Sequence, residues 1–258
     1  MKLQKRKIKL DKDDYIFLNE QTLFKANGEE GLHLWESSVL FSRYIKRNKI
    51  IFENKNIIEL GSGCGLLGIT CLMYTDCSHL TFSDYQQSVI DNLIQNISMN
   101  KINHNHIASN DFHTSESIKN YDHPHCVGCY PGRYSILNMD WRDYDKYKLE
   151  SYDYVIGSEL IYCGGHIEEL AKLIKNLLKL DGKALIAMPE KRSMTKNFID
   201  YLTENGLSYE AKYFKDECND DEIFEKILES EKESKKLFED LTSMKIMLYT
   251  IYKNKSVN

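Results

Sequence analysis

The sequence lacks the features that mark membrane-spanning and secreted proteins. No stretch approaches the roughly 18 to 20 apolar residues that a membrane-spanning helix requires. Acidic residues, not the apolar core of a secretory signal, follow the basic start of the chain. The 7 cysteines are an odd number, and several lie in apolar runs where a reduced thiol packs as a small hydrophobe. We therefore expect a protein of the reducing cytoplasm or nucleus that has no membrane partner.

Charge and motif content disfavour several further classes of function. The 34 basic and 39 acidic residues leave a net charge of -5, so the chain has no general attraction to nucleic acid. Neither the G-x-S-x-G motif of acyl hydrolases nor a phosphate-binding P-loop occurs, and no internal repeat is visible. With 258 residues, 42% of them hydrophobic, the chain is expected to form a single monomeric domain.

Apolar runs and helical periodicity alternate along most of the chain. Strands are predicted at residues 57–60, 80–82, 154–156, 184–188, 207–214 and 245–252. Helices are predicted at residues 66–73, 89–97, 167–180 and 198–202, with the pair Asp181-Gly182 as a turn. This alternation predicts an α/β fold whose mostly parallel sheet is covered by helices on both faces.

Three segments depart from this alternation. Residues 1–30 are expected to form an N-terminal extension, and residues 102–132, rich in Asn, His and Ser, a surface insertion. Residues 216–239 are dense in Glu and Lys and predict a charged helical connection between the last two strands. Within the insertion, His123, His125, Cys126 and Cys129 could bind zinc, but adjacent ligands cannot easily reach one ion. No metal site is therefore expected, and the whole chain is interpreted as one domain.

A glycine loop follows the first predicted internal strand. In the segment Glu59-Leu60-Gly61-Ser62-Gly63-Cys64-Gly65, glycines allow a tight turn and a close approach of the backbone to a ligand. Asp84 follows the next strand, where a carboxylate can accept both hydrogen bonds of a ribose diol. The loop and Asp84 together predict a nucleoside site.

The loop alone does not identify its ligand. Gly63, Gly65 and Gly68 also satisfy the G-x-G-x-x-G pattern of dinucleotide enzymes, so a nicotinamide or flavin cofactor and an empty turn are alternatives. Glu59 would repel a pyrophosphate but would attract the cationic amino-acid end of S-adenosylmethionine. The chain also lacks a second glycine loop and a second mononucleotide-binding half. These features favour S-adenosyl-L-methionine as the cofactor.

Five segments carry a more specific resemblance. They are Gly31-Leu32-His33-Leu34-Trp35-Glu36-Ser37-Ser38, the glycine loop, Phe82-Ser83-Asp84, Met139-Asp140-Trp141 and Ser158-Glu159-Leu160-Ile161-Tyr162. In this order they resemble methyltransferase family 16, protein methyltransferases that mostly modify lysines on elongation factors, chaperones or calmodulin. The resemblance covers residues 30–100 and 134–205 and looks nearest to the elongation factor 2 lysine methyltransferases. It implies a seven-stranded Rossmann-like sheet with an antiparallel last strand.

The resemblance also implies roles for individual residues. Trp35 and Glu36 would line the cofactor side. Asp84 would hold the ribose, and Asp140 with Trp141 would border the adenine. Glu159 and Tyr162 match the acidic-x-x-aromatic motif that faces the substrate amine, and they are the predicted catalytic residues. The full set of predicted cofactor-binding residues is Trp35, Glu59, Gly61, Ser62, Gly63, Gly65, Asp84, Asp140, Trp141 and Ser158.

The sequence does not decide whether the acceptor of the methyl group is a lysine or a histidine nitrogen. Most lysine-modifying members have Asp where this chain has Glu159, and a histidine-modifying relative shows a similar acidic variant. The first expectation is transfer of a methyl group to a lysine of a protein substrate. Alternatives are transfer to a histidine or a small molecule, and an inactive module that kept the cofactor fold.

Overall fold

The computed structural model describes residues 3–11, 13–21, 30–100, 102, 126–130, 133–147, 150–162, 165–214 and 245–254, with backbone alone for 126–130. Within these residues one sheet has eight strands in the order β5-β6-β4-β3-β7-β8-β10-β9. Their bounds are β3 Asn56–Leu60, β4 His79–Asp84, β5 Cys126–Tyr130, β6 Tyr134–Asn138, β7 Tyr152–Ser158, β8 Leu178–Pro189, β9 Leu207–Tyr213 and β10 Ile246–Lys253. Strands β6, β4, β3, β7 and β8 are parallel, whereas β10 is antiparallel to both β8 and β9. This confirms the predicted fold class, and β5 adds an antiparallel edge strand to it.

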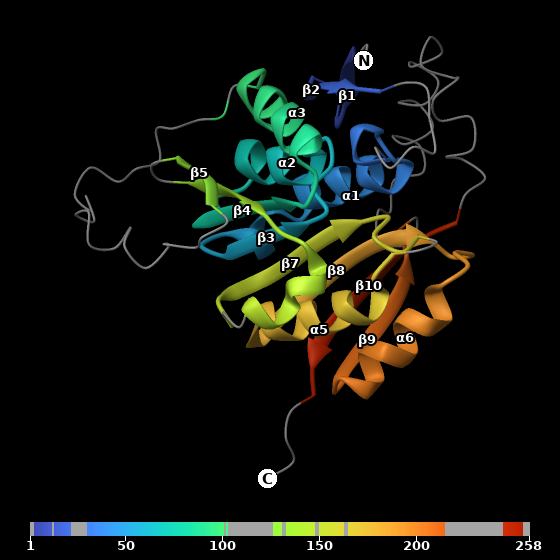
Figure 1. The fold of residues 1–258 in the computed structure, drawn as a ribbon. Helices are drawn as coiled ribbons and strands as arrows, with labels where there is room; N and C mark the ends of the chain where they lie inside the picture. Colours follow the sequence, from blue (N-terminus) through green and yellow to red (C-terminus); the bar gives the residue numbers. More distant parts are fainter. Residues whose placement is uncertain are drawn as a thin grey trace.

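Helices cover both faces of the sheet. Their bounds are α1 Glu36–Arg47, α2 Leu66–Tyr74, α3 Gln87–Ser98, α5 Ile167–Leu177 and α6 Thr195–Glu204. In Figure 1, α1, α2 and α3 lie above the sheet and α5 and α6 lie below it. The neighbours Ile57 and Ile58 on β3 belong to different core clusters, one on each side, and both are fully buried. A central strand buried on both faces explains why neighbouring residues of β3, and not only alternate ones, are apolar.

The N-terminal residues form a separate two-stranded hairpin. Strands β1 (Gln4–Lys9) and β2 (Tyr15–Glu20) pair antiparallel, with Gln4 opposite Glu20. Ile8, Ile16 and Leu18 on its inner side are buried in the same core cluster as α1, α2 and α3. The hairpin, which belongs to the segment expected to be an extension, is therefore packed onto the domain near α3 (Figure 1).

Some predicted boundaries were wrong. The helix predicted at residues 167–180 ends at Leu177, because Leu178 already pairs with Tyr152 of β7. Asp181 and Gly182 do not end an element but lie inside β8, where its register with β7 shifts. Helix α1 and strands β5 and β6 were not predicted. The candidate zinc side chains and the charged connection 216–239 lie outside the described residues.

No helix in the described part of the chain is long and apolar enough to cross a bilayer.

Substitution of Gly65 tests the packing at the start of α2, and Gly206, which also has left-handed backbone, serves as the control. A Cβ on Gly65 (φ +84) would lie 2.3 Å from the buried Leu93 Cδ1, whereas a Cβ on Gly206 (φ +73) would have nothing within 4 Å. Gly206→Ala should lower the free energy of unfolding by about 1 kcal/mol through backbone strain alone. Gly65→Ala should lower it by about 2 to 4 kcal/mol, because overpacking adds to the strain. Urea denaturation measures both, and equal losses would contradict the packing of α2 against α3.

Candidate active site

A cavity of about 580 Å³ lies at the carboxyl ends of β3, β4 and β7. This volume is within the range of small-molecule sites. The cavity brings together the predicted cofactor-binding and catalytic residues Trp35, Glu59, Gly61, Ser62, Gly63, Gly65, Asp84, Asp140, Trp141, Ser158, Glu159 and Tyr162. Glu36, which was expected beside Trp35 on the cofactor side, does not line it. Ligand sites of open α/β sheets are expected at this edge, beyond the carboxyl ends of the strands.

The glycine loop turns from β3 into α2 through left-handed backbone. Gly61, Gly63 and Gly65 have φ values of +56, +53 and +84, which residues with a Cβ adopt at a cost. A Cβ on Gly63 would lie 3.0 Å from the carbonyl oxygen of Gly31, so the loop also lies close to the opposite wall of the cavity. The glycines are therefore needed both for the turn and for the close approach of two backbone segments.

Glu59 lies beneath this loop. Its residue is 2% exposed, and its Oε2 accepts a hydrogen bond from the Gly68 backbone N–H at 3.1 Å. A Cβ on Gly68 would lie 2.7 Å from Glu59 Oε2 and 2.2 Å from Phe82 Cε1, which explains the glycine at this position. Burial raises the pKa of Glu59 to about 8, although hydrogen bonds from Gly68 and Ser62 lower it. One oxygen of this carboxyl therefore braces the loop.

Asp84 ends β4 and faces the same loop. Its Oδ2 accepts from the Gly63 N–H at 3.1 Å and its Oδ1 from the Gln86 N–H at 3.2 Å. Burial raises the pKa of Asp84, and the backbone donors oppose that rise. Ser62 has a bracing role, because its hydroxyl accepts from the Ser83 N–H at 3.0 Å.

Asp140 and Trp141 form another wall of the cavity. Asp140 caps the 3-10 turn Trp141–Lys146 by accepting from the Arg142 N–H at 2.9 Å. The side-chain hydrogen bond from Arg142 lowers the pKa of Asp140, so this carboxyl is ionised. The Trp141 ring lies 6.5 Å from the Tyr162 ring, centroid to centroid, at 51°. The predicted adenine side and the predicted acceptor side of the cavity therefore meet at these two rings.

Glu159 has backbone and side-chain constraints of its own. Its φ of +57 is unusual for a residue with a side chain, and its N–H donates to the Ala187 carbonyl at 2.9 Å. Its nearly buried carboxylate accepts hydrogen bonds from the Ser37 hydroxyl and from Arg192 Nη2. The predicted acceptor-binding acid therefore already has a cationic partner, which the sequence did not indicate.

Arg192 comes from the loop after β8. Its guanidinium carbon lies 5.6 Å from the centroid of the Trp35 ring, a cation–π distance. Burial lowers the pKa of Arg192, but a guanidinium stays charged in proteins. Trp35, Arg192 and Glu159 thus form one stacked and ion-paired group on the cavity wall.

Tyr162 is the most open of the predicted catalytic residues. Tyr162 is 43% exposed, and partial burial raises the pKa of its hydroxyl to about 12. The hydroxyl therefore stays protonated at neutral pH and can donate a hydrogen bond.

Further residues that line the cavity were not predicted. They are Glu30, Gly31, His33, Leu34, Ser38, Cys64, Leu66, Tyr85, Gln86, Met139, Arg142, Leu160, His166 and Arg192. Tyr85 and Gln86 directly follow Asp84 at the end of β4, so their position in the sequence could have indicated them. Arg192 has no such signal, because only the tertiary fold brings it to Glu159.

The raised pKa of Glu59 predicts how stability depends on pH. The folded protein holds a proton on Glu59 up to a pKa of about 8, whereas the unfolded chain releases it near 4.5. Without cofactor, the free energy of unfolding should therefore fall as pH rises from 4.5 to 8. Glu59→Gln keeps an acceptor for the Gly68 N–H and should flatten this fall, leaving the part due to Asp84, whose pKa is also raised by burial. Urea denaturation measures the free energy of unfolding of both proteins at each pH. The same pH dependence in the two proteins would contradict a protonated Glu59.

Comparisons with known proteins agree with the fold and the motifs. A family model described as "Lysine methyltransferase" matches residues 12–125 and 132–205. Histidine protein methyltransferase 1 homolog of Dictyostelium discoideum is 30% identical over 68% of this chain and 48% of that protein. Human protein-lysine N-methyltransferase EEF2KMT is 25% identical over 63% of this chain and 44% of that protein. The chain thus spans about half the length of these curated relatives.

Solved structures share the fold at low sequence identity. The structure of P. horikoshii TYW2 in complex with MeSAdo has a TM-score of 0.52 and 12% identity, over 98% of this chain and 72% of that chain. The methyltransferase family and its structural neighbours indicate S-adenosyl-L-methionine as the cofactor. Because the family model matches more than half of the residues, the chain belongs to the lysine methyltransferase family.

Proposed function

We propose that the chain is an S-adenosylmethionine-dependent protein N-methyltransferase that modifies a lysine of a cytoplasmic protein, such as a translation elongation factor. The observation that carries the proposal is one cavity with two chemically distinct ends. The glycine loop and Asp84 form one end, and Glu159 and Tyr162 form the other. The family match and the lysine and histidine methyltransferases among the relatives support this function. The buried, unpaired thiols of Cys64, Cys71 and Cys77 support a reducing compartment.

The residues at the loop end fit the cofactor. Gly61, Gly63 and Gly65 line the cavity where the amino-acid part would lie, and the carboxylate of Asp84 can accept from a ribose diol. The face of Trp141 offers an apolar surface for adenine. Glu59 lies close enough to the loop to attract a cationic group, which would also favour its ionised form. When bound, S-adenosylmethionine would supply a methyl group attached to a positively charged sulfur. The lone pair of the acceptor nitrogen would form the new bond to this methyl carbon, and the sulfur would keep the electron pair of the broken carbon–sulfur bond.

The acceptor end must hold a neutral nitrogen with its lone pair directed at the methyl group. Glu159 can accept an N–H of the acceptor, since a carboxylate has lone pairs beyond those used by Ser37 and Arg192. Arg192 offsets the charge of Glu159, which would otherwise raise the pKa of a lysine amine placed there and keep it protonated. Tyr162 can donate its hydroxyl hydrogen or offer its ring to the same group.

A histidine acceptor is the second candidate, and the ion pair of Glu159 with Arg192 favours it. The charge of Glu159 is already balanced, so the site has little electrostatic need for a second cation. Imidazole has a pKa of about 6.5 and is mostly neutral at physiological pH, whereas a lysine amine must first lose a proton. The Dictyostelium relative is named as a histidine protein methyltransferase.

Substitution of Glu159 tests the function and its acceptor end. Glu159→Gln should reduce transfer of labelled methyl groups to proteins of a cell extract by about 100-fold or more. The affinity for S-adenosylmethionine, measured by calorimetry, should change little, because the loop end is untouched. Glu168→Gln is a matched control, since it breaks an ion pair with Lys172 on α5 outside the cavity.

Other outcomes would contradict parts of this proposal. Equal loss of transfer and of cofactor affinity in Glu159→Gln would make Glu159 a purely structural residue. The double variant Glu159→Gln with Arg192→Met removes both charges and shows whether an unpaired Arg192 causes any loss of stability. A labelled product that survives prior protease treatment of the extract would indicate a small-molecule acceptor, and calorimetric binding of NAD in place of S-adenosylmethionine would indicate an oxidoreductase.

A further inference from the structure

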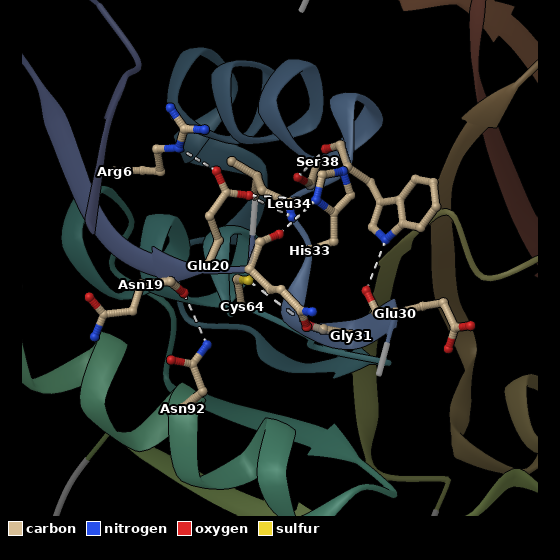
Figure 2. Close-up of polar contacts among 12 residues, drawn as sticks. Arg6, Asn19, Glu20, Glu30, Gly31, His33, Leu34, Ser38, Cys64 and Asn92 are labelled. Atoms are coloured by element: carbon tan, nitrogen blue, oxygen red, sulfur yellow. Dashed lines mark hydrogen bonds and ion pairs between the residues drawn. The ribbon is translucent and has the colours of Figure 1, made fainter. Parts of the chain in front are cut away.

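The N-terminal hairpin places a buried carboxylate directly behind the cavity wall. Glu20, the last residue of β2, is fully buried. Its Oε1 accepts from Arg6 Nε at 2.5 Å, and its Oε2 accepts from the Leu34 backbone N–H at 3.0 Å. Figure 2 shows the Glu20 carboxylate between Arg6 on one side and Leu34 and His33 on the other. A buried charge needs such partners, so Glu20 strongly favours one position of the Leu34 backbone.

The segment that Glu20 holds is a wall of the cavity. Residues 30, 31, 33, 34 and 35 all line it. The Gln21 N–H donates to the Leu32 carbonyl at 2.7 Å, and His33 Nδ1 lies 3.2 Å from the Gln21 carbonyl oxygen. The end of the hairpin therefore fixes this segment from outside the cavity.

The inner side of the same segment contacts the glycine loop. The Cys64 thiol donates to the Gly31 carbonyl at 3.8 Å, and that carbonyl is the group a Cβ on Gly63 would meet. The segment is thus held between the hairpin and the loop. Any outward shift of Leu34 would move Gly31 away from Gly63 and widen the cavity at its loop end.

Helix α3 connects the hairpin to the glycine loop by a second route. The Asn19 N–H donates to Asn96 Oδ1 at 2.7 Å. Asn92 Nδ2 donates to the Asn19 carbonyl at 3.0 Å (Figure 2). Asn96 Nδ2 also donates to the Cys64 carbonyl at 2.9 Å. The hairpin, the glycine loop and the cavity wall are therefore connected by one network of hydrogen bonds. In this network, Glu20 is the charged residue that contacts the wall.

We propose that Glu20 is a positioning residue for cofactor binding, which acts by holding residues 30–35 against the glycine loop. The identity of the ligand rests on the proposed function, but the anchoring of the wall does not. Glu20 lies behind the wall and does not line the cavity, so it acts through Leu34 and Gly31.

The test compares two hairpin variants of the full chain. Glu20→Gln keeps the shape but removes the charge, and Asp14→Asn removes an exposed ion pair between the hairpin and Lys46 of α1. Glu20→Gln should weaken S-adenosylmethionine binding about tenfold by calorimetry, because a displaced wall no longer matches the ligand. Hydrogen exchange of the Leu34 amide should become faster in the same variant. Asp14→Asn should leave both quantities at wild-type values.

Other outcomes would overturn the proposal or separate its failure from a failure of the proposed function. Unchanged affinity and unchanged Leu34 exchange in Glu20→Gln, with or without a lower melting temperature, would overturn the proposal. If Glu20→Gln does not fold, Glu20→Asp decides, because its shorter side chain keeps the charge but cannot reach both Arg6 and the Leu34 N–H. Wild-type affinity with wild-type exchange in Glu20→Asp would overturn the proposal. If the wild-type protein itself does not bind S-adenosylmethionine, the proposed function fails, while Leu34 exchange still reports whether Glu20 anchors the wall.

Discussion

The turn from β3 into α2 is the constraint on which the rest of the site depends. Left-handed backbone at Gly61, Gly63 and Gly65 brings the chain from the end of a buried strand to the start of a buried helix. Glu59 holds the turn from below through the Gly68 N–H, and Asp84 holds it from the side through the Gly63 N–H. The segment that contains Gly31 then packs against the loop and forms a wall of the cavity.

Within the described residues, four buried carboxyls lie around this turn and the cavity, and they are stabilised in two ways. Glu20 and Glu159 are paired with arginines, whereas Glu59 and Asp84 accept hydrogen bonds from backbone N–H groups. Burial raises the pKa of both Glu59 and Asp84. A ligand that brings a positive charge or hydroxyl donors to the loop end would stabilise the ionised forms of these two groups. The arginine-paired carboxyls instead hold protein segments in place before any ligand binds.

Much of the fold could be predicted because β3, α2, β4 and α3 have clear local patterns. The boundary of α5 was wrong because the apolar spacing continues through Leu177 and Leu178 into β8, and only pairing with β7 ends the helix. Strand β6 was missed because it follows an insertion that interrupts the alternation. Strand β6 pairs with β4 across a long sequence separation: Thr81 and Ser135, which lie opposite each other, are 54 positions apart.

The candidate site was predictable where its residues end strands or form the glycine loop. Asp84, Ser158 and Glu159 follow directly from the carboxyl ends of β4 and β7. The partners of Glu159 were not predictable, since Ser37 lies 122 positions away in the sequence and Arg192 lies 33 positions away. Such contacts arise from tertiary packing and leave no local pattern. The same holds for Glu20, whose contact with Leu34 depends on how the hairpin packs on the domain.

The acceptor residue itself tests the proposed activity most directly. Mass spectrometry of proteins methylated by the purified chain in an extract, with S-adenosylmethionine carrying a labelled methyl group, reports that residue. The account predicts the label on the side-chain nitrogen of one lysine in a protein, and the charge-balanced Glu159 makes a histidine the second expected site. Label on no protein, or on carboxyl or sulfur atoms only, would contradict a protein N-methyltransferase.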